Sequence, residues 1–435
     1  METTASAPAE VHDAFEFVEA SGGIEAYRLK ANDLQVLLLP EAAAPVVTLM
    51  VTYRVGSRDE ATGLTGATHF LEHLMFKGTE RFNKRRGTSV FNVLQRVGAQ
   101  VNASTSVDRT NYYELLPKEH LPMAVEIEAD RMRGALINAD DLEAERTVIL
   151  NELDRGKNEP LRNLYQALWS VAYVAHPYHH PTIGWRSDVE QVTVEGLRHF
   201  YDTYYWPNNA TVSIIGDVDR AEALDLVARH FGAMPRAPEP IPTMRTREPE
   251  QHGERRLIIR EAGHVGALMM GYKTPPALDP DTDALGALAI VLTWGKSGRL
   301  YRALTDQGLT AQVTASTTRW RDPGLFYFLA LLAPGRTHEE VEAAIDAMVK
   351  QIQDDGITEA ELQRAKNQLR AQEAYSRDGP YAIAAQLNEA ISAGDWKLYT
   401  TFRERLERVT TDDVQRVAQT YLHEDRRTVG WYVPG

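Results

Sequence analysis

The sequence predicts an α+β protein made of two homologous halves, because an internal repeat runs through alternating strand-like and helix-like patterns. Residues 46–53, VVTLMVTY, correspond to residues 265–272, VGALMMGY. The segment GAQVNASTSVDRTNYYELL then corresponds to GLTAQVTASTTRWRDPGLFYFLALL. Each copy continues into an acidic segment with helical spacing, EHLPMAVEIEADRM in the first and HEEVEAAIDAMV in the second. We therefore expect two copies of one fold.

The repeat and the breaks around it divide the chain into four segments. Residues 1–20 begin with the polar run METTASAPAEVHD and are expected to be a disordered lead. Residues 21–234 are the expected first domain, and residues 257–435 are its homologue. Between them, residues 235–256 start with PRAPEPIP, whose proline content is typical of an extended linker.

The composition is that of a large soluble enzyme. The 435 residues are enough for two domains of about two hundred residues each. No apolar run approaches the ~18 residues that span a bilayer. With no cysteine, the chain has neither disulfides nor thiolate metal ligands. A formal net charge of −14 argues against a nucleic-acid-binding surface.

The run HFLEHLMF at residues 69–76 is predicted to be a helix that carries a metal site. His69 and His73 stand four residues apart, so their imidazoles share one helix face, and Glu72 lies close to the same face. Two imidazoles can bind one zinc ion while the carboxylate points at the metal-bound water. The spacing H-x-x-E-H is the motif of inverted zinc peptidases.

A third ligand is expected from residues 140–155, which begin with capping and acidic residues and stop at Gly156. Glu145 and Glu152 lie seven residues apart, two turns along one face of this helix. One carboxylate can bind the metal, and the other can hold a ligand through a hydrogen bond. The spacing alone leaves open which glutamate has which role.

HFLEHLMFKGTERF, followed about eighty residues later by ERTVILNE, resembles the pitrilysin/insulinase family of zinc metallopeptidases in its short bacterial form. The family's order of segments continues with TYRVGSRDEATGLTGAT before the motif and VGAQVNASTSVDRTNYYELL, HPYHHPTIG and FYDTYYWPNNATVSIIGDVD after it. The resemblance implies two halves of the mitochondrial-processing-peptidase-like fold in a clam-like arrangement. It also assigns the roles: His69, His73 and Glu152 bind one zinc ion per chain, Glu72 is the general base, and Glu145 holds a ligand.

The resemblance further suggests where a peptide binds. We expect the substrate to add as a strand along the edge formed by residues 101–105, where Asn102 and Ala103 contact it. Phe76 is expected to contribute to a hydrophobic pocket after the cleaved bond; packing in the core is an equally good interpretation of this residue.

The second half lacks the motif and also departs from the family at a second position. Where the first half has HFLEH, residues 283–290 read DALGALAI. Active members carry an arginine and a tyrosine in a segment resembling L-R-E-x-x-G-L-x-Y, which contact substrate and the developing oxyanion. Here Thr305 and Ala311 stand at those two positions, and neither can supply the charge or the phenol.

The missing pair favours a zinc-bearing endopeptidase subunit, acting on short or unfolded peptides, that borrows arginine and tyrosine from a homologous, non-identical partner. One alternative is a self-sufficient homodimeric peptidase, and the less favoured one is a non-catalytic structural homologue. The N-terminus has neither the basic nor the apolar region of a signal peptide. Because related short bacterial enzymes are often exported, the resemblance weakly favours the bacterial periplasm over the cytoplasm.

Overall fold

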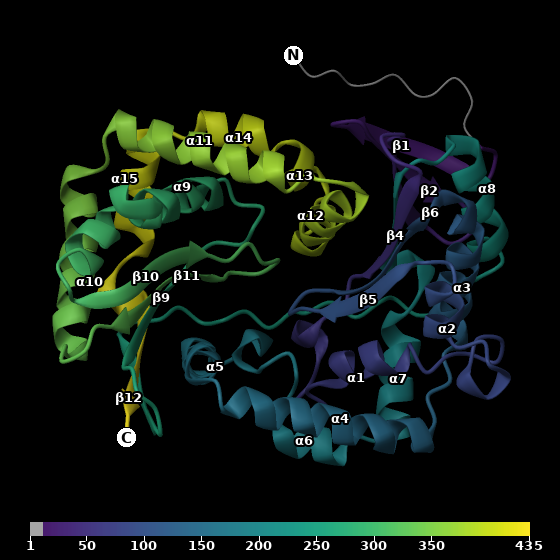
Figure 1. The fold of residues 1–435 in the computed structure, drawn as a ribbon, viewed down its shortest axis with the longest axis horizontal. Helices are drawn as coiled ribbons and strands as arrows, with labels where there is room; N and C mark the ends of the chain where they lie inside the picture. The colour runs from purple at the N-terminus through teal and green to yellow at the C-terminus, as the bar shows by residue number, and fades with distance from the viewer. Residues whose placement is uncertain (1–11) are drawn as a thin grey trace. The chain divides into compact units, whose positions relative to one another are not determined.

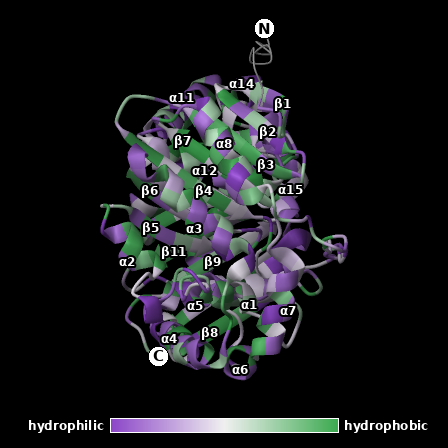
Figure 2. Ribbon diagram, turned by 90° about the vertical axis from the view of Figure 1, so that its right-hand side faces the viewer, coloured by the Kyte–Doolittle hydropathy of each residue, from purple (hydrophilic) through white to green (hydrophobic). Residues whose placement is uncertain are grey.

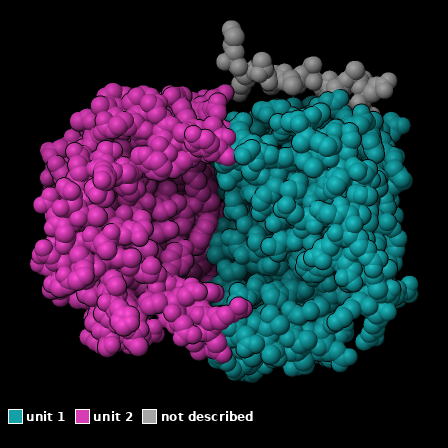
Figure 3. Space-filling view, viewed as in Figure 1, with its two compact units in different colours: residues 1–153, 181–245, 376–401 teal, residues 154–180, 246–375, 402–435 magenta. Residues whose placement is uncertain are grey.

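The computed structural model describes residues 12–435, which form an α+β fold with two sheets (Figure 1). Two compact units are distinguished in Figure 3. Unit 1 comprises residues 12–153 of the described chain, 181–245 and 376–401, and unit 2 comprises residues 154–180, 246–375 and 402–435. Among the described residues, no helix is both long and apolar enough to cross a bilayer.

Unit 1 is built on a seven-stranded sheet in the order β1-β2-β3-β7-β4-β6-β5. The strands are β1 (Phe15–Ser21), β2 (Ile24–Leu29), β3 (Leu34–Pro40), β4 (Val46–Tyr53), β5 (Gln100–Thr105), β6 (Thr110–Pro117) and β7 (Ala210–Gly216). The helices grouped with it are α1 (Ala67–Leu74), α2 (Val90–Gln95), α3 (Leu121–Gly134), α4 (Ala139–Lys157), α6 (Arg186–Gln191), α7 (Val194–Tyr204), α8 (Arg220–Phe231), α12 (Pro380–Ala393) and α13 (Lys397–Thr400). The sheet order leaves β5 at an edge.

Unit 2 is built on a five-stranded sheet in the order β10-β11-β9-β12-β8. Its strands are β8 (Arg255–Glu261), β9 (Ala267–Lys273), β10 (Thr310–Thr317), β11 (Leu325–Leu332) and β12 (Arg427–Pro434). Its helices are α5 (Pro160–Ala172), α9 (Asp281–Thr293), α10 (His338–Asp355), α11 (Glu359–Tyr375), α14 (Phe402–Arg408), α15 (Thr411–Tyr421) and a π-helix over Tyr301–Thr305.

The two sheets repeat one topology. In unit 1, β4 pairs antiparallel with β6 and β7, and β7 pairs parallel with β3. In unit 2, β9 pairs antiparallel with β11 and β12, and β12 pairs parallel with β8. The hairpins β5–β6 and β10–β11 occupy matching edge positions. The strands predicted to correspond in sequence therefore correspond in the sheets, and β1 and β2 are an addition to unit 1.

Each sheet is covered on one face by a helix that comes from the other half of the sequence. α12 packs on β4 and β7 of unit 1, and α5 packs on β12, β8 and β9 of unit 2. Gly271 and Gly430 let α5 approach, because a Cβ at either glycine would lie about 3 Å from the side chains of Leu168 or Leu164. Unit 1 thus includes α12 and α13 from the C-terminal half of the chain, and unit 2 includes α5 from the N-terminal half, whereas the predicted domains were continuous stretches of sequence.

The core of unit 1 lies on both faces of its sheet. Alternate residues of β4, such as Leu49 and Val51, pack in one core with α1, α3 and α7, while Met50 packs on the opposite face. There it meets Leu387 and Ile391 of α12, and burying each such aliphatic side chain contributes about 1.5–3 kcal/mol. Figure 2 shows hydrophobic residues concentrated along the central strands of this sheet.

Three predicted boundaries need correction. The lead does not extend through residue 20, because Phe15–Ser21 pairs with β2 as β1; residues 1–11 lie outside the described residues. Likewise, the linker ends before residue 256, because β8 begins at Arg255 and gains a parallel neighbour in β12. Gly156 does not stop the acidic helix, which continues to Lys157.

Candidate metal centre

Helix α1 begins at a glycine that the fold requires. Gly66 has φ +87°, and a Cβ at this position would lie 2.6 Å from the carbonyl oxygen of Ile183. The Glu60 carboxylate accepts hydrogen bonds from the backbone N–H groups of Gly66 and Thr68, each at 2.8 Å. A buried acid at the positive end of the helix thereby fixes where α1 starts, and so where its histidines lie.

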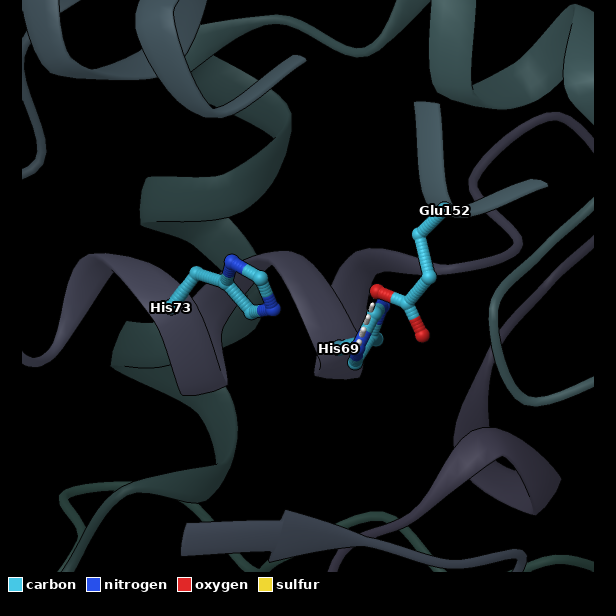
Figure 4. Close-up of side chains that lie close together, drawn as sticks. All are labelled: His69, His73 and Glu152. Atoms are coloured by element: carbon cyan, nitrogen blue, oxygen red, sulfur yellow. Dashed lines mark ion pairs between the residues drawn. The ribbon is translucent and has the colours of Figure 1, made fainter. Parts of the chain in front are cut away.

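His69, His73 and Glu152 lie together, as the sequence predicts (Figure 4). The two histidines share the partly exposed face of α1, whose opposite face is buried through Phe70, Leu71 and Leu74. One ligand atom from each of the three residues lies within 4.8 Å of the others. Nε2 of His69 is 3.7 Å from a carboxylate oxygen of Glu152, which comes from α4.

Glu145 is a buried residue of α4 that holds His73 in place. Its carboxylate lies 2.8 Å from Nδ1 of His73 and also pairs with Lys77. Burial alone would lower the pKa of His73, but the hydrogen bond and charge of Glu145 raise it. In return, the hydrogen bond from His73 lowers the pKa of Glu145. Because Nδ1 is engaged, Nε2 of His73 is the nitrogen that remains for a metal.

Glu72 lies close enough to His73 and Glu152 to feel their charges, and it also contacts the edge strand. The hydroxyl of Thr105, the last residue of β5, donates to its carboxylate at 2.5 Å. Burial raises the pKa of Glu72, against the opposing effect of the Thr105 hydrogen bond and of the charge on His73. A carboxylate with a raised pKa beside a metal site is suited to receive and release a proton.

Asn102 and Ala103 lie on β5, which is an edge strand, so its outer backbone groups can pair with a peptide. The side chain of Asn102 is exposed and that of Ala103 is buried. They project to opposite faces of the sheet, as neighbours in a strand do. The register places Asn102 opposite Tyr113 and Ala103 opposite Tyr112 on β6.

A network that sequence reasoning missed supports the end of this edge strand. Arg109 donates to the carbonyl oxygen of Ser104 at 3.1 Å and to Oδ1 of Asn111 at 2.7 Å. Its other nitrogens bind Glu389, which lies on α12. No periodic pattern connects residues 280 positions apart, so single-sequence analysis offers no signal for this pair. The ion pair of Lys77 with Glu145 was missed as well, because Lys77 lies in the turn after α1, where helical spacing no longer predicts a neighbour.

Phe76 is half-buried beside the end of α1 and stacks on Phe91 of α2, with ring centroids 4.7 Å apart. Its other neighbours are the guanidinium of Arg131, 5.1 Å from the ring centre, and the ring of Tyr112. Phe91 keeps 37% of its surface exposed. The pair therefore presents a partly accessible aromatic surface, and sequence reasoning did not single out Phe91.

In unit 2, Thr305 is the last residue of the π-helix and Ala311 lies on β10. The hydroxyls of Thr305 and Thr310 are 3.0 Å apart. The helix that corresponds to α1 is α9, and among the described residues the three-residue group in unit 1 is the one arrangement that could hold a metal.

The donor set fits zinc. Two imidazoles and one carboxylate are the ligands of many catalytic zinc sites, which keep a fourth position for water or substrate. The engaged Nδ1 of His73 fixes its ring, and Glu72 is left beside the ligands without joining them. This set of side chains is therefore the one expected at a catalytic zinc site.

The chain belongs to the insulinase family, peptidase family M16. The model of that family matches residues 35–184, and a model described as the inactive domain of the same family matches residues 191–369. The first match contains the candidate metal centre, and the second contains the half without one. The family resemblance and the α+β fold of two similar halves are confirmed.

Similar proteins of known name extend over nearly the whole chain. Zinc protease PqqE of Helicobacter pylori is 32% identical over 93% of this chain and 91% of its own length. The mitochondrial-processing peptidase subunit beta of Lentinula edodes is 26% identical over 90% of this chain and 86% of its own. A crystal structure of a Helicobacter pylori protease has a TM-score of 0.89 at 30% identity, covering 94% of this chain and 99% of that one.

Proposed function

We propose that this chain is the zinc-bearing subunit of an endopeptidase that hydrolyses short or unfolded peptides. The observation that carries the proposal is the cluster of His69, His73 and Glu152, whose ligand atoms lie within 4.8 Å of one another beside Glu72. The name of the Helicobacter pylori relative, a zinc protease, supports the same activity.

His69, His73 and Glu152 would hold one zinc ion. Bound there, zinc would supply Lewis acidity, which lowers the pKa of water toward about 7 and polarises a scissile carbonyl. Glu72 takes the proton from the attacking water and delivers it to the leaving amine. Glu145 keeps the imidazole of His73 oriented throughout, and the hydroxyl of Thr105 holds the carboxylate of Glu72 next to the edge strand.

The peptide adds as a strand to β5 and so presents its backbone along the strand that ends at Thr105. Main-chain pairing imposes little sequence preference, which suits a peptidase of unfolded chains. Asn102 and Ala103 contact alternate side chains of the peptide. Phe76, together with Phe91, forms the hydrophobic surface for the residue after the cleaved bond.

A homologous partner subunit supplies the arginine and tyrosine that Thr305 and Ala311 cannot provide. Support comes from the resemblance to a processing-peptidase beta subunit, which is by name one subunit of an assembly. The alternative is a homodimer in which other residues take this role. The periplasmic location expected from the resemblance stays a prediction.

The test is to assay the purified, zinc-loaded chain on an unfolded peptide, alone and mixed with a homologue that carries the pair but lacks H-x-x-E-H. We expect poor turnover alone and a large gain on mixing. Substituting the partner's tyrosine should then lower kcat more than it raises KM, because the phenol acts mainly on the developing oxyanion. Full activity of the isolated chain, unchanged by any such partner, would leave the homodimer. No hydrolysis in any mixture would contradict the proposed function.

A further inference from the structure

A groove of about 580 Å³ in unit 2 is lined by three arginines. It lies among the segment that includes the π-helix Tyr301–Thr305, α10 and α11. Its polar lining consists of Arg299, Arg302, Gln351, Thr358, Glu361 and Arg364. All of these residues belong to unit 2 and none belongs to the candidate metal centre.

The charges of this groove do not balance. Its lining contains three arginines and a single carboxylate, that of Glu361, and so carries a formal charge of +2. The whole chain, by contrast, carries −14. A local excess of positive charge on an acidic protein attracts anions and disfavours cations.

Glu361 cannot neutralise more than one of the arginines. Two nitrogens of Arg299 bind its two oxygens, each at 2.8 Å, and Thr358 donates to it through both its backbone N–H and its hydroxyl, each at 2.9 Å. The hydrogen bond from Arg299 is the main reason that the pKa of Glu361 is lowered to about 2, so the pair stays fully charged. Arg299 is thereby held in one orientation.

Hydrogen-bonding capacity remains after this pairing. Arg299 is occupied by this pairing, and its third guanidinium nitrogen, Nη1, is buried, so the donors that a ligand in the groove can reach are those of the other two arginines. Within the same described range, Arg302 and Arg364 form no ion pair, and both side chains are exposed. Two unpaired, exposed guanidinium groups in one groove can bind an oxyanion through several charge-assisted hydrogen bonds.

The backbone of the groove is also unusual. Arg302 and Ala303 belong to the π-helix, a conformation that is rare and that occurs frequently at functional sites. The π-helix is therefore a second observation, independent of the charges, that favours a functional role for this segment.

We propose that this groove binds a doubly charged phosphate group, either inorganic phosphate or a phosphate monoester, through Arg302 and Arg364. A phosphate monoester carries a charge close to −2 at neutral pH, which matches the lining, whereas a single carboxylate would leave one positive charge uncompensated. The site is separate from the proposed peptidase chemistry, and its test does not depend on catalytic activity.

The experiment is isothermal titration calorimetry of the full chain with inorganic phosphate and with phosphoserine, at ionic strength held constant with sodium chloride. Sodium acetate is the singly charged comparison. We expect saturable binding of the phosphates, with a Kd of about 1 mM or below, and at least about tenfold weaker binding of acetate. Tighter binding of phosphoserine than of phosphate would identify an organic phosphate as the ligand, and equal binding would identify the free ion.

Three variants locate the binding. Arg302→Gln combined with Arg364→Gln removes two unpaired, exposed groups, so the fold should persist while phosphate affinity falls at least about tenfold. Arg247→Gln combined with Arg260→Gln removes the same charge from exposed positions of unit 2 outside the groove, and should leave the affinity unchanged. His69→Ala should also leave it unchanged. The absence of saturable binding, an equal loss in both double variants, or a loss in His69→Ala would each overturn the proposal.

Discussion

Replacing Glu145 with glutamine should weaken zinc binding while leaving every proposed ligand in place. The Glu145 side chain is only 9% exposed, lies 2.8 Å from Nδ1 of His73 and pairs with Lys77. Glutamine keeps the shape and one acceptor oxygen but loses the charge that makes the imidazole a stronger ligand. Loss of such a supporting partner typically costs ~10–100-fold in metal affinity, equivalent to about 1.4–2.7 kcal/mol.

The assay is a competition titration of zinc against a chromogenic chelator at fixed pH, with circular dichroism to check the fold. Glu143→Gln is the matched control, because Glu143 lies on the same helix, is 67% exposed and pairs with Arg146 instead. It should bind zinc like the wild type. If Glu145→Gln retained wild-type affinity, the supporting role would be wrong; an equal loss in both variants would mean that net charge, and not the hydrogen bond to His73, sets the affinity.

The other predictions concern the base, the edge strand and a buried lysine. Glu72→Gln should keep about one zinc per chain by elemental analysis but lower kcat by ~10²–10⁴, and near-wild-type turnover would remove Glu72 from the mechanism. Glu389→Gln should raise KM for an unfolded peptide by about two- to fivefold, because it breaks the partly exposed ion pair that connects Arg109, and with it the end of β5, to α12. Glu19→Gln, which removes the ion pair with Lys397, should leave KM unchanged. Equal effects of the two substitutions on KM would argue against a role of Glu389 in peptide binding. Lys273 lies 3.1 Å from the centre of the Tyr173 ring, and burial lowers its pKa from 10.5 to about 7. Since its folded-state pKa lies below its unfolded-state pKa, the wild type should lose stability relative to Lys273→Met as the pH falls from 10.5 to 7, by an amount on the order of a few kcal/mol. Urea unfolding at pH 7, 8.5 and 10 measures the difference, and a constant difference would contradict the shift.

The sequence was sufficient for the parts of the structure that depend on local spacing. His69 and His73 share a helix face because they are four residues apart, and α1 has no glycine or proline to interrupt it. The internal repeat anticipated the matching hairpins β5–β6 and β10–β11, since two similar strand patterns that are close in sequence and separated by a turn favour an antiparallel pair. Even the relation of Glu145 and Glu152 follows from two turns of one helix.

The sequence was insufficient where the partner of an element is decided by tertiary packing. The apolar residues of α12 predict that one side of this helix is buried. They do not predict that it packs on Met50 and Ile215 of the unit 1 sheet, because packing on the sheet of unit 2 would bury the same residues. The domain boundaries therefore missed the exchange of α5 and α12. The contact between Arg109 and Glu389 could not be predicted from the sequence either, because it forms only when α12 packs on the sheet that contains β5.

This exchange has a consequence for how metal binding and catalysis can be separated. The proposed ligands, the proposed base and Glu145 all lie in unit 1, and so do the edge strand β5 and the segment of the C-terminal half that supports it. Thr305 and Ala311 lie in unit 2. If the missing arginine and tyrosine are what limits the isolated chain, zinc content should be near normal without a partner, whereas turnover should be low. A partner that raised zinc affinity as much as it raised turnover would instead be completing the fold of unit 1, and the borrowed-pair explanation would no longer be needed.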